Sequence, residues 1–452
     1  MKLKILIANR GEIAVRIIRA AHELGLETVA IYSEADRDAL FVRYADQAVC
    51  IGPPPLAESY LYYQNILAAA KSTGADAIHP GYGFLSENAS FAEACRVLNI
   101  VFIGPHAMAI RKMGDKAMAK KIMKEAGVPV VPGSEGVLAS LAEAKSLAKD
   151  IGFPVIIKAS AGGGGRGMRI VTEKKELENA YNSAVNEAQK AFGDASVYLE
   201  KFIEDPKHIE IQVLGDKHGN AVHLFERDCS VQRRHQKLLE EAPSPVLDET
   251  TRAAMSEIAV RAAQSVRYDS VGTIEFIYDI KSKEYYFIEM NTRIQVEHPV
   301  TEMITRIDLI KHQIQVAAGE PLALKQEQIV KSGHAIECRI NAEDPENNFM
   351  PQAGTLSQYI VPGGPGIRVD SGVYQGYAIP PYYDSMIAKL IVWGDTRKDA
   401  VARMKRALRE FIIEGVKTTI PFHLQILQNK DFLSGAYTTS FIGKILAAKG
   451  DH

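Results

Sequence analysis

The chain has 452 residues, more than one hydrophobic core supports, so we expect roughly two to four domains. Its 53 lysine and arginine residues nearly balance 55 aspartate and glutamate residues, and the formal charge of -2 argues against a nucleic-acid partner. The four cysteines are too widely spaced for a zinc site or a disulfide framework. Because no apolar run reaches the roughly 18 residues of a membrane span and no signal peptide is recognisable, we expect a cytoplasmic protein without a membrane partner.

Strands and helices alternate over roughly the first 110 residues. This alternation is typical of βαβ units, so the sequence predicts a parallel, Rossmann-like sheet. The predicted strands cover residues 3–8, 28–32, 77–79 and 101–103, and the predicted helices include residues 60–72 and 89–98.

The pattern changes after two predicted helices at residues 115–127 and 140–151. Seven strand-like runs follow with few long helices between them, which favours an α+β domain with antiparallel pairing. These runs cover residues 154–158, 168–171, 197–202, 208–214, 221–226, 273–278 and 285–290. A break near residues 326–333 precedes a third segment that is strand-rich at first and ends in helices at 397–410 and 421–427.

A glycine-rich stretch, Gly-Gly-Gly-Gly-Arg-Gly at residues 162–167, lies between two predicted strands. It therefore forms a hairpin tip and differs from a P-loop, which opens a helix. Its bare amides could fold over phosphates, although a plain flexible turn fits the pattern equally well. Lys158 at the end of the preceding strand and Lys116 at a helix start are cations that could hold phosphate oxygens.

Polar and apolar residues alternate in the strand around His208. His208, Glu210 and Gln212 share one face of this strand, and the opposite face is apolar. We expect the polar face to line a polar site, with a sheet face open to water as the alternative.

Two carboxylates and an amide meet at the end of the last predicted strand of the middle segment. Glu289 and Asn291 are two residues apart and share one face, and hairpin arithmetic places Glu275 opposite Ile288 or Glu289. A set of oxygen ligands without histidine or cysteine suits magnesium. The sequence therefore predicts a magnesium site here, with a solvated loop as the alternative.

Four longer motifs carry a resemblance to a known family. They are residues 7–14 (Ile-Ala-Asn-Arg-Gly-Glu-Ile-Ala), 79–88 (His-Pro-Gly-Tyr-Gly-Phe-Leu-Ser-Glu-Asn), 226–237 (Glu-Arg-Asp-Cys-Ser-Val-Gln-Arg-Arg-His-Gln-Lys) and 381–387 (Pro-Tyr-Tyr-Asp-Ser-Met-Ile). Over essentially its whole length the chain resembles the biotin carboxylase subunit of bacterial acetyl-CoA carboxylase.

The resemblance implies a multidomain α/β and α+β fold of three parts. A Rossmann-like domain would cover residues 1–114, and an ATP-grasp domain with a mobile glycine-rich lid (about 131–203) would cover 115–330. A strand-rich domain would cover residues 331–446.

The resemblance also implies roles residue by residue. ATP would contact Lys116, Lys158, Gly164, Gly165, Glu200, Lys201, Phe202, Ile203, His208, Gln232, His235, Glu275 and Glu289. Two Mg²⁺ or Mn²⁺ ions would bind Glu275, Glu289 and Asn291. Bicarbonate would contact Lys237, Arg293, Gln295 and Val296, and biotin would contact Tyr82 and Arg339. Lys237, Arg293, Glu297 and Arg339 would be catalytic, with Glu297 as the base.

The implied reaction is ATP-dependent carboxylation of biotin by bicarbonate through carboxyphosphate. The chain has no Met-Lys-Met-type biotinylation site, so biotin would arrive on a biotin carboxyl carrier protein, and a carboxyltransferase subunit would use the product. Acetyl-CoA in fatty acid synthesis is the expected acceptor, with pyruvate or another 2-oxo acid as the alternative. Other ATP-grasp enzymes that activate a carboxylate for an amine, and a regulatory nucleotide-binding subunit, are the alternative classes.

Besides Ala161, which stands where many relatives extend the glycine run, three positions depart from the family pattern. Pro365 stands where the family often carries a large side chain that, with Arg16 and Arg19, contributes to a dimer contact, so the expected homodimer rests on weaker ground. Arg267 and Arg306 stand where relatives often have glycine, so we expect strain there if the backbone has a positive φ.

Overall fold

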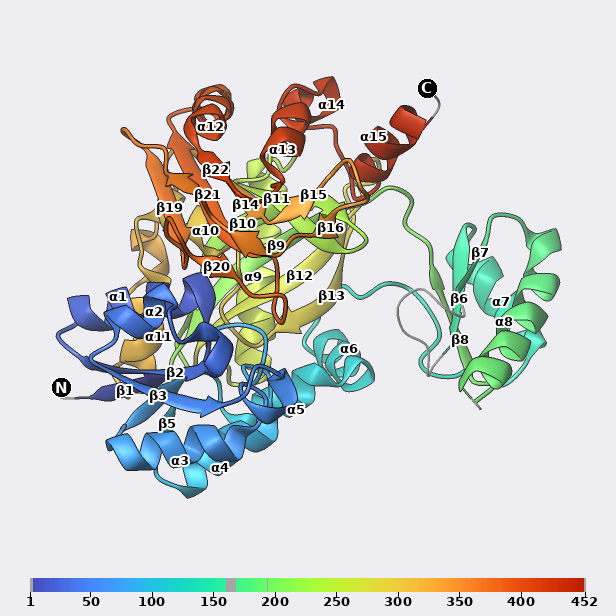
Figure 1. Ribbon diagram of the computed structural model, residues 1–452. Helices are drawn as coiled ribbons and strands as arrows, with labels where there is room; N and C mark the ends of the chain where they lie inside the picture. The colour runs from blue at the N-terminus through green and yellow to red at the C-terminus, as the bar shows by residue number, and fades with distance from the viewer. Residues whose placement is uncertain (1–2, 160–167, 193, 451–452) are drawn as a thin grey trace.

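The computed structural model describes residues 3–159, 168–192 and 194–450. Its N-terminal part is a parallel sheet in the order β3-β2-β1-β4-β5 (Figure 1), as predicted. Ile5 and Ile7 of β1 pack into one core, whereas Leu6 and Ala8 pack into another, so helices cover both faces of the sheet. The elements are β1 (Lys4–Ile7), α1 (Gly11–Glu23), β2 (Glu27–Ser33), η1 (Glu34–Asp36), α2 (Leu40–Tyr44), β3 (Gln47–Gly52), η2 (Leu56–Glu58), α3 (Tyr63–Thr73), β4 (Ala77–His79), α4 (Ala89–Val97), β5 (Val101–Phe102) and α5 (Ala107–Gly114).

A small module stands off from the rest of the molecule on the right of Figure 1. It has its own antiparallel sheet, β7-β6-β8, and its own apolar core, which includes Ala144, Val155 and Leu199. The pairing of β6 with β7 agrees with the predicted hairpin, but the glycine stretch itself, with Gly164 and Gly165, lies outside the described residues. Its elements are α7 (Leu141–Ile151), β6 (Val155–Ala159), β7 (Met168–Val171), η3 (Lys174–Glu176), α8 (Leu177–Phe192) and β8 (Val197–Lys201), and α6 (Lys116–Glu125) precedes it.

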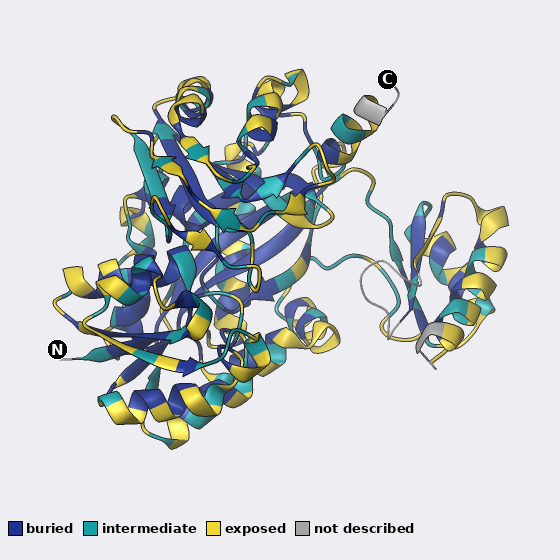
Figure 2. Cartoon of the chain, in the orientation of Figure 1, coloured by how far each residue is buried: buried dark blue, intermediate teal, exposed yellow. Residues whose placement is uncertain are grey.

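One eight-stranded sheet, in the order β13-β12-β9-β10-β11-β14-β21-β19, forms the centre of the molecule. It is antiparallel throughout and runs across the predicted boundary near residue 330, because β11 pairs with β14. The burial colours of Figure 2 show this sheet as the most enclosed part of the chain. Its elements before the boundary are β9 (Lys207–Gly215), β10 (Ala221–Arg233), β11 (Gln236–Ala242), α9 (Glu249–Ser265), β12 (Val271–Tyr278), β13 (Tyr285–Asn291), α10 (His298–Thr305), α11 (Leu309–Ala317) and η4 (Gln326–Gln328).

The C-terminal part adds three strands to the central sheet and covers it with helices. Its core is shared with α1 of the N-terminal part, so the two ends of the chain pack as one body. The elements are β14 (His334–Asn341), β15 (Glu343–Asp344), β16 (Met350–Pro351), β17 (Gly354–Thr355), β18 (Gln358–Ile360), β19 (Ile367–Ser371), β20 (Ala378–Ile379), β21 (Met386–Gly394), α12 (Arg397–Glu410), β22 (Ile412–Glu414), α13 (Ile420–Ile426), α14 (Lys430–Ser434) and α15 (Phe441–Gly450).

The structure extends one sequence prediction and agrees with another. The strand predicted at residues 221–226 continues to Arg233 as β10, and a two-residue turn at Arg234 and His235, both with positive φ, leads into β11. Arg267 and Arg306 have φ of 50° and 60°, so both occupy the left-handed region that favours glycine. No helix among the described residues has the length and apolar character needed to cross a bilayer.

Candidate active site

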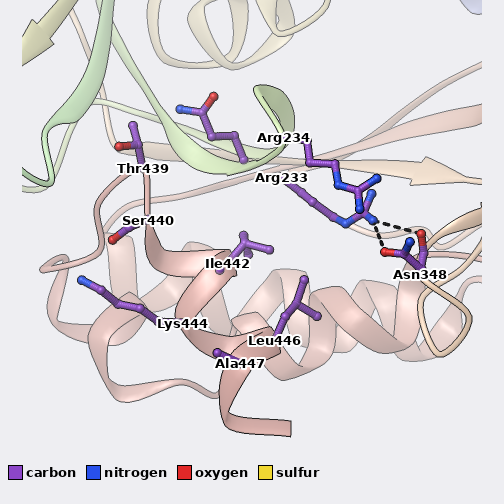
Figure 3. Close-up of a pocket in the computed structure, with 11 residues that line it drawn as sticks. Arg233, Arg234, Asn348, Thr439, Ser440, Ile442, Lys444, Leu446 and Ala447 are labelled. Atoms are coloured by element: carbon purple, nitrogen blue, oxygen red, sulfur yellow. Dashed lines mark hydrogen bonds between the residues drawn. The ribbon is translucent and has the colours of Figure 1, made fainter. Parts of the chain in front are cut away.

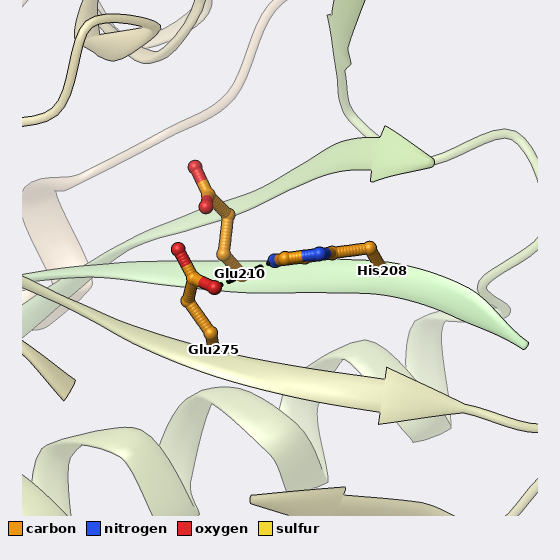
Figure 4. A group of neighbouring side chains, drawn as sticks. All are labelled: His208, Glu210 and Glu275. Atoms are coloured by element: carbon orange, nitrogen blue, oxygen red, sulfur yellow. Dashed lines mark ion pairs between the residues drawn. The ribbon is translucent and has the colours of Figure 1, made fainter. Parts of the chain in front are cut away.

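Three carboxylates lie side by side across neighbouring strands of the central sheet. Glu275 of β12 is in register with Glu210 of β9 on one side and with Glu289 of β13 on the other. The predicted hairpin register is therefore right, and a bulge after Glu275 leaves Ile288 outside the pairing. Figure 4 shows Glu275 and Glu210 pointing to the same side of the sheet as His208.

Glu275 is a buried carboxylate with three hydrogen-bond donors and an ion-pair contact to His208. Its Oε1 accepts from Asn291 Nδ2 at 2.8 Å, Gln295 Nε2 at 3.1 Å and Lys237 Nζ at 3.1 Å, and Oε2 lies 2.8 Å from His208 Nε2. Burial alone would raise the pKa of Glu275, but the charges of Lys237 and His208 hold it well below its usual value. Glu275 is therefore ionised at neutral pH.

Glu289 differs from Glu275, although the two residues face one another. Its side chain is half-buried and, in the part of the chain that the structure describes, has no hydrogen-bond or ion-pair partner. Burial and the charge of Glu275 raise the pKa of Glu289, and Lys116 opposes them. A cation between the two carboxylates would relieve this repulsion, and the ligand set of carboxylate and amide oxygens fits magnesium.

Lys237 of β11 is the central cation of the site. Its Nζ lies 2.6 Å from Glu210, 2.6 Å from Glu297 and 3.1 Å from Glu275. These carboxylates outweigh the effect of burial and raise the pKa of Lys237 well above its usual value. Arg227, which is fully buried, donates to Glu210 from the other side.

Arg293 lies at the rim of the site, where its guanidinium group contacts three side chains. Nη2 donates to Asn291 Oδ1 at 2.8 Å, Nη1 donates to Gln295 Oε1 at 2.7 Å, and Nε donates to Glu87 at 3.0 Å. The planar group is thus held in a fixed orientation, as bidentate recognition of an anion requires.

Glu297 is almost fully buried and lies between two cations. Lys237 Nζ is 2.6 Å from one oxygen and Arg339 Nη2 is 2.9 Å from the other. Burial would raise the pKa of Glu297, but Lys237 and Arg339 hold it well below its usual value. Arg339 of β14 is itself fixed by Glu240, whose Oε1 accepts from Nε at 2.6 Å.

Tyr82 and Arg339, the two residues expected to face biotin, come from opposite ends of the chain. The Tyr82 hydroxyl donates to the carboxylate of Glu12 in the first turn of α1. Burial and the negative charge of Glu12 raise the pKa of Tyr82 well above its usual value, while Arg339 acts in the opposite direction.

The predicted ATP contacts divide into two groups. His208, Glu275 and Glu289 lie in the central sheet, whereas Lys158, Glu200, Lys201, Phe202 and Ile203 lie in or next to the small module. Lys158 Nζ is 2.8 Å from Glu200 Oε2, and Lys120 of α6 reaches the other oxygen at 2.6 Å. Among the described residues no hydrogen bond or ion pair joins the two groups, and the small module stands apart from the central sheet in Figure 1.

Gln232 and His235 lie at and next to the β10–β11 turn, where Gln232 is in register with Lys237. Gln232 lines an open pocket of about 550 Å³ between this turn and α15, and His235 is exposed. Figure 3 shows Arg233 in this pocket, with two hydrogen bonds to Asn348. The pocket wall combines basic side chains with the apolar side chains of Ile442 and Leu446.

Comparisons with known proteins agree with this arrangement. The family model of the biotin carboxylase N-terminal domain matches residues 1–110, that of the carbamoyl-phosphate synthase L chain ATP-binding domain matches 115–325, and that of the biotin carboxylase C-terminal domain matches 337–444. Biotin carboxylase 1 of Bacillus subtilis is 62% identical over 439 residues, which are 97% of this chain and 98% of that protein. The chain belongs to the biotin carboxylase family.

Relatives in this family carry more than one name. A pyruvate carboxylase subunit of Methanothermobacter thermautotrophicus is 56% identical, over 97% of this chain and 89% of that protein. A solved structure of the 2-oxoglutarate carboxylase biotin carboxylase domain dimer from Hydrogenobacter thermophilus, in complex with MgADP, ADP and bicarbonate, matches with a TM-score of 0.88 at 56% identity. The match covers 98% of this chain and 97% of that one. These comparisons confirm the relationship to biotin carboxylases and to ATP-grasp proteins that the sequence predicted.

Sequence reasoning gave no role to several residues that hold the site in place. Arg227, Glu240 and Glu87 hold Glu210, Arg339 and Arg293, respectively. Glu87 and Arg227 lie inside the motifs at 79–88 and 226–237, so the motifs could have marked both residues as part of the site. Which site residue each one supports depends on contacts between distant segments, such as the one from Arg293 to Glu87 across 206 positions.

Proposed function

We propose that the cluster around Lys237 is where bicarbonate is phosphorylated by ATP and biotin is then carboxylated. The observation that carries this proposal is the position of Glu297, a buried carboxylate between Lys237 and Arg339. An oxyanion that enters here meets two cations and a base within one enclosed site.

The first step is the attack of bicarbonate on the γ-phosphorus of ATP. Glu297 takes the proton from bicarbonate, whose oxygen then forms a bond to phosphorus as ADP leaves. Glu297 is a weak base while Lys237 and Arg339 contact it, but the negative charge of bicarbonate next to it raises its proton affinity. Arg293, Gln295 and the amide of Val296 would hold the anion in line with ATP.

Carboxyphosphate, the product of this step, then supplies both the carbon and a base. It releases CO2 and phosphate, the phosphate takes the proton from the ureido nitrogen of biotin, and the nitrogen attacks CO2. Arg339 would stabilise the negative charge that develops on the ureido oxygen, and Tyr82 would lie against the biotin ring. Glu240 fixes Arg339 in the orientation that this role requires.

The nucleotide would bridge the central sheet and the small module. We propose that His208, Glu275 and Glu289 act on its phosphate end together with Asn291, Lys116 and Lys158. Two Mg²⁺ or Mn²⁺ ions on the carboxylates and Asn291 would neutralise charge on the transferred phosphoryl group. The strand from Glu200 to Ile203 would lie beside the adenine, and the pocket at Gln232 and the His235 turn would complete the base and ribose end. The stretch with Gly164 and Gly165 would cover the phosphates.

The reaction also needs partner proteins. We propose a biotin carboxyl carrier protein and a carboxyltransferase subunit, with acetyl-CoA as the final acceptor and pyruvate or another 2-oxo acid as the alternative. The dimeric structure from Hydrogenobacter thermophilus supports a homodimer. The two residues at the expected dimer contact give no such support, because Arg16 pairs with Glu302 and Asp308 of its own chain and Pro365 is an exposed proline. Sedimentation at micromolar concentration tests the dimer, and a monomer alone would contradict it.

Steady-state ATP hydrolysis with bicarbonate and free biotin tests the proposed reaction. We expect hydrolysis that depends on both compounds, and a loss of about a hundredfold or more in Arg293→Ala and Glu297→Ala, the usual size when a charge-stabilising group or base is lost. Near-normal turnover in both variants would contradict the assignment.

A further inference from the structure

The loop between β13 and α10 offers two backbone amides to an anion. In the described part of the chain, the N–H groups of Val296 and Glu297 have no hydrogen-bond acceptor, whereas the carbonyl groups of Gln295 and Val296 each accept from a side-chain donor. His298 Nδ1 lies 2.7 Å from the carbonyl oxygen of Gln295, and Lys389 Nζ lies 2.8 Å from that of Val296. Since a carbonyl oxygen only accepts, His298 donates from Nδ1.

These two contacts determine where the amides point. A trans peptide is planar, so its C=O and N–H point in opposite directions. The contact of His298 with Gln295 therefore sets the direction of the Val296 amide, and the contact of Lys389 with Val296 sets that of the Glu297 amide. Both amides therefore point away from the buried side chains of His298 and Lys389.

Lys389 is fully buried in β21, where it lies directly opposite Arg339 of β14. A buried cation needs an anionic partner, and its Nζ lies 3.2 Å from Oε1 of Glu12. The same Glu12 oxygen accepts the hydroxyl of Tyr82. Lys389 is thus linked through Glu12 to Tyr82, which is expected to face biotin. Through its hydrogen bond to the carbonyl of Val296 it also holds the loop between β13 and α10, the bicarbonate loop.

We propose that Lys389 is a positioning residue that fixes the bicarbonate loop relative to Tyr82, the residue expected to face biotin. We propose that His298 positions the bicarbonate loop but not Tyr82. This inference rests on the proposed function of the loop and of Tyr82. It differs from a purely structural role for Lys389, because an ion pair that only stabilises the fold would leave the Michaelis constants of the folded enzyme unchanged.

The first test compares Lys389→Met with wild type. Methionine keeps most of the volume and removes the charge and the donor. We expect KM for bicarbonate and KM for biotin each to rise about tenfold or more, the usual effect of a lost buried hydrogen bond, with KM for ATP unchanged within about twofold. Lys217→Met is the matched control, because Lys217 donates to the carbonyl of Ala317 at 2.7 Å outside the site, and its constants should equal those of wild type.

The second test uses His298 and holds even if Lys389→Met does not fold. In His298→Asn the amide can replace Nδ1 as donor to Gln295, whereas His298→Leu has no donor. We expect KM for bicarbonate to rise about tenfold in His298→Leu and to return toward wild type in His298→Asn, with KM for biotin unchanged in both.

The outcomes separate this inference from the proposed function. A folded Lys389→Met enzyme with wild-type constants for bicarbonate and biotin would overturn the role of Lys389, and equal constants in His298→Leu, His298→Asn and wild type would overturn that of His298. In both cases the proposed function stands if Arg293→Ala still loses turnover. Wild-type enzyme without bicarbonate-dependent ATP cleavage would instead contradict the proposed function itself.

Discussion

The central sheet and the small module hold their charged site residues in different ways. In and beside the sheet, the side chains of Glu275 and Glu297 are buried and that of Lys237 is 12% exposed, and each contacts at least two oppositely charged or polar partners. In the module, the side chain of Lys158 is 29% exposed and, among the described residues, pairs only with Glu200, which also pairs with Lys120 of α6. The side chains proposed for acid–base chemistry are therefore already in contact, whereas those proposed to bind the nucleotide must exchange partners before they act.

This difference has an energetic consequence. Removing one member of a buried charge network leaves the others without compensation, which costs several kcal/mol, whereas exposed pairs contribute about 0 to 1 kcal/mol. Substitutions in the sheet should therefore change stability and chemistry together, and substitutions in the module should change nucleotide affinity alone.

The largest effect is expected for Lys237→Met. Glu210, Glu275 and Glu297 would lose their common cation, so the free energy of unfolding should fall by about 3 to 5 kcal/mol. Because Lys237 also contacts Glu297, the proposed base, kcat should fall about a hundredfold. Denaturant unfolding and steady-state kinetics check both values. Lys124→Met, which removes the exposed pair with Glu135, is the control. An equal loss of stability in that variant would contradict the difference between buried and exposed charges.

A smaller and more selective effect is expected for Lys158→Met. The variant should raise KM for ATP about tenfold, as expected for one lost charged contact with phosphate, without changing the denaturant midpoint of the central body. Lys120→Met is the matched control, because Lys120 contacts the same Glu200 but is not expected to reach ATP. A similar KM in both variants would show that the ion pair with Glu200, and not phosphate binding, explains the result.

The smallest effect concerns pH and an acid pair next to Arg339. Glu240 and Glu337 are cross-strand neighbours, and burial raises the pKa of Glu240 to about 7 and that of Glu337 well above its usual 4.5. A carboxyl whose pKa rises on folding costs stability as the pH climbs from its unfolded pKa through its folded pKa. The isosteric Glu337→Gln should thus lose less unfolding free energy than wild type between pH 5 and pH 8. An identical loss in denaturant titrations at the two pH values would contradict this.

Local pattern was enough to predict that carboxylates of two neighbouring strands meet at the proposed metal site. The length of one hairpin predicted that Glu275 lies opposite Ile288 or Glu289, and the register places it opposite Glu289. Period and spacing could not predict which distant residues meet there. Lys237, Arg339 and Lys389 come from three strands whose order in the sheet follows from tertiary packing, and no local pattern predicts that β11 pairs with β14.

Resemblance supplied what pattern could not, but it did not supply the supporting contacts. It assigned roles to Arg293 and Arg339, but it did not predict that Glu87 and Glu240 are their hydrogen-bond partners, which depends on the tertiary fold. The position of the small module also escaped prediction, because the module has a core of its own and meets its neighbours through polar contacts such as that of Glu200 with Lys120.

The most direct measurement follows an oxygen atom from bicarbonate to phosphate. If bicarbonate attacks the γ-phosphorus at this cluster, bicarbonate labelled with oxygen-18 should transfer label to inorganic phosphate during biotin-dependent ATP cleavage. The rate of label transfer should fall about a hundredfold in Glu297→Ala. Unlabelled phosphate from the wild-type enzyme, released at the full rate of ATP cleavage, would contradict the account.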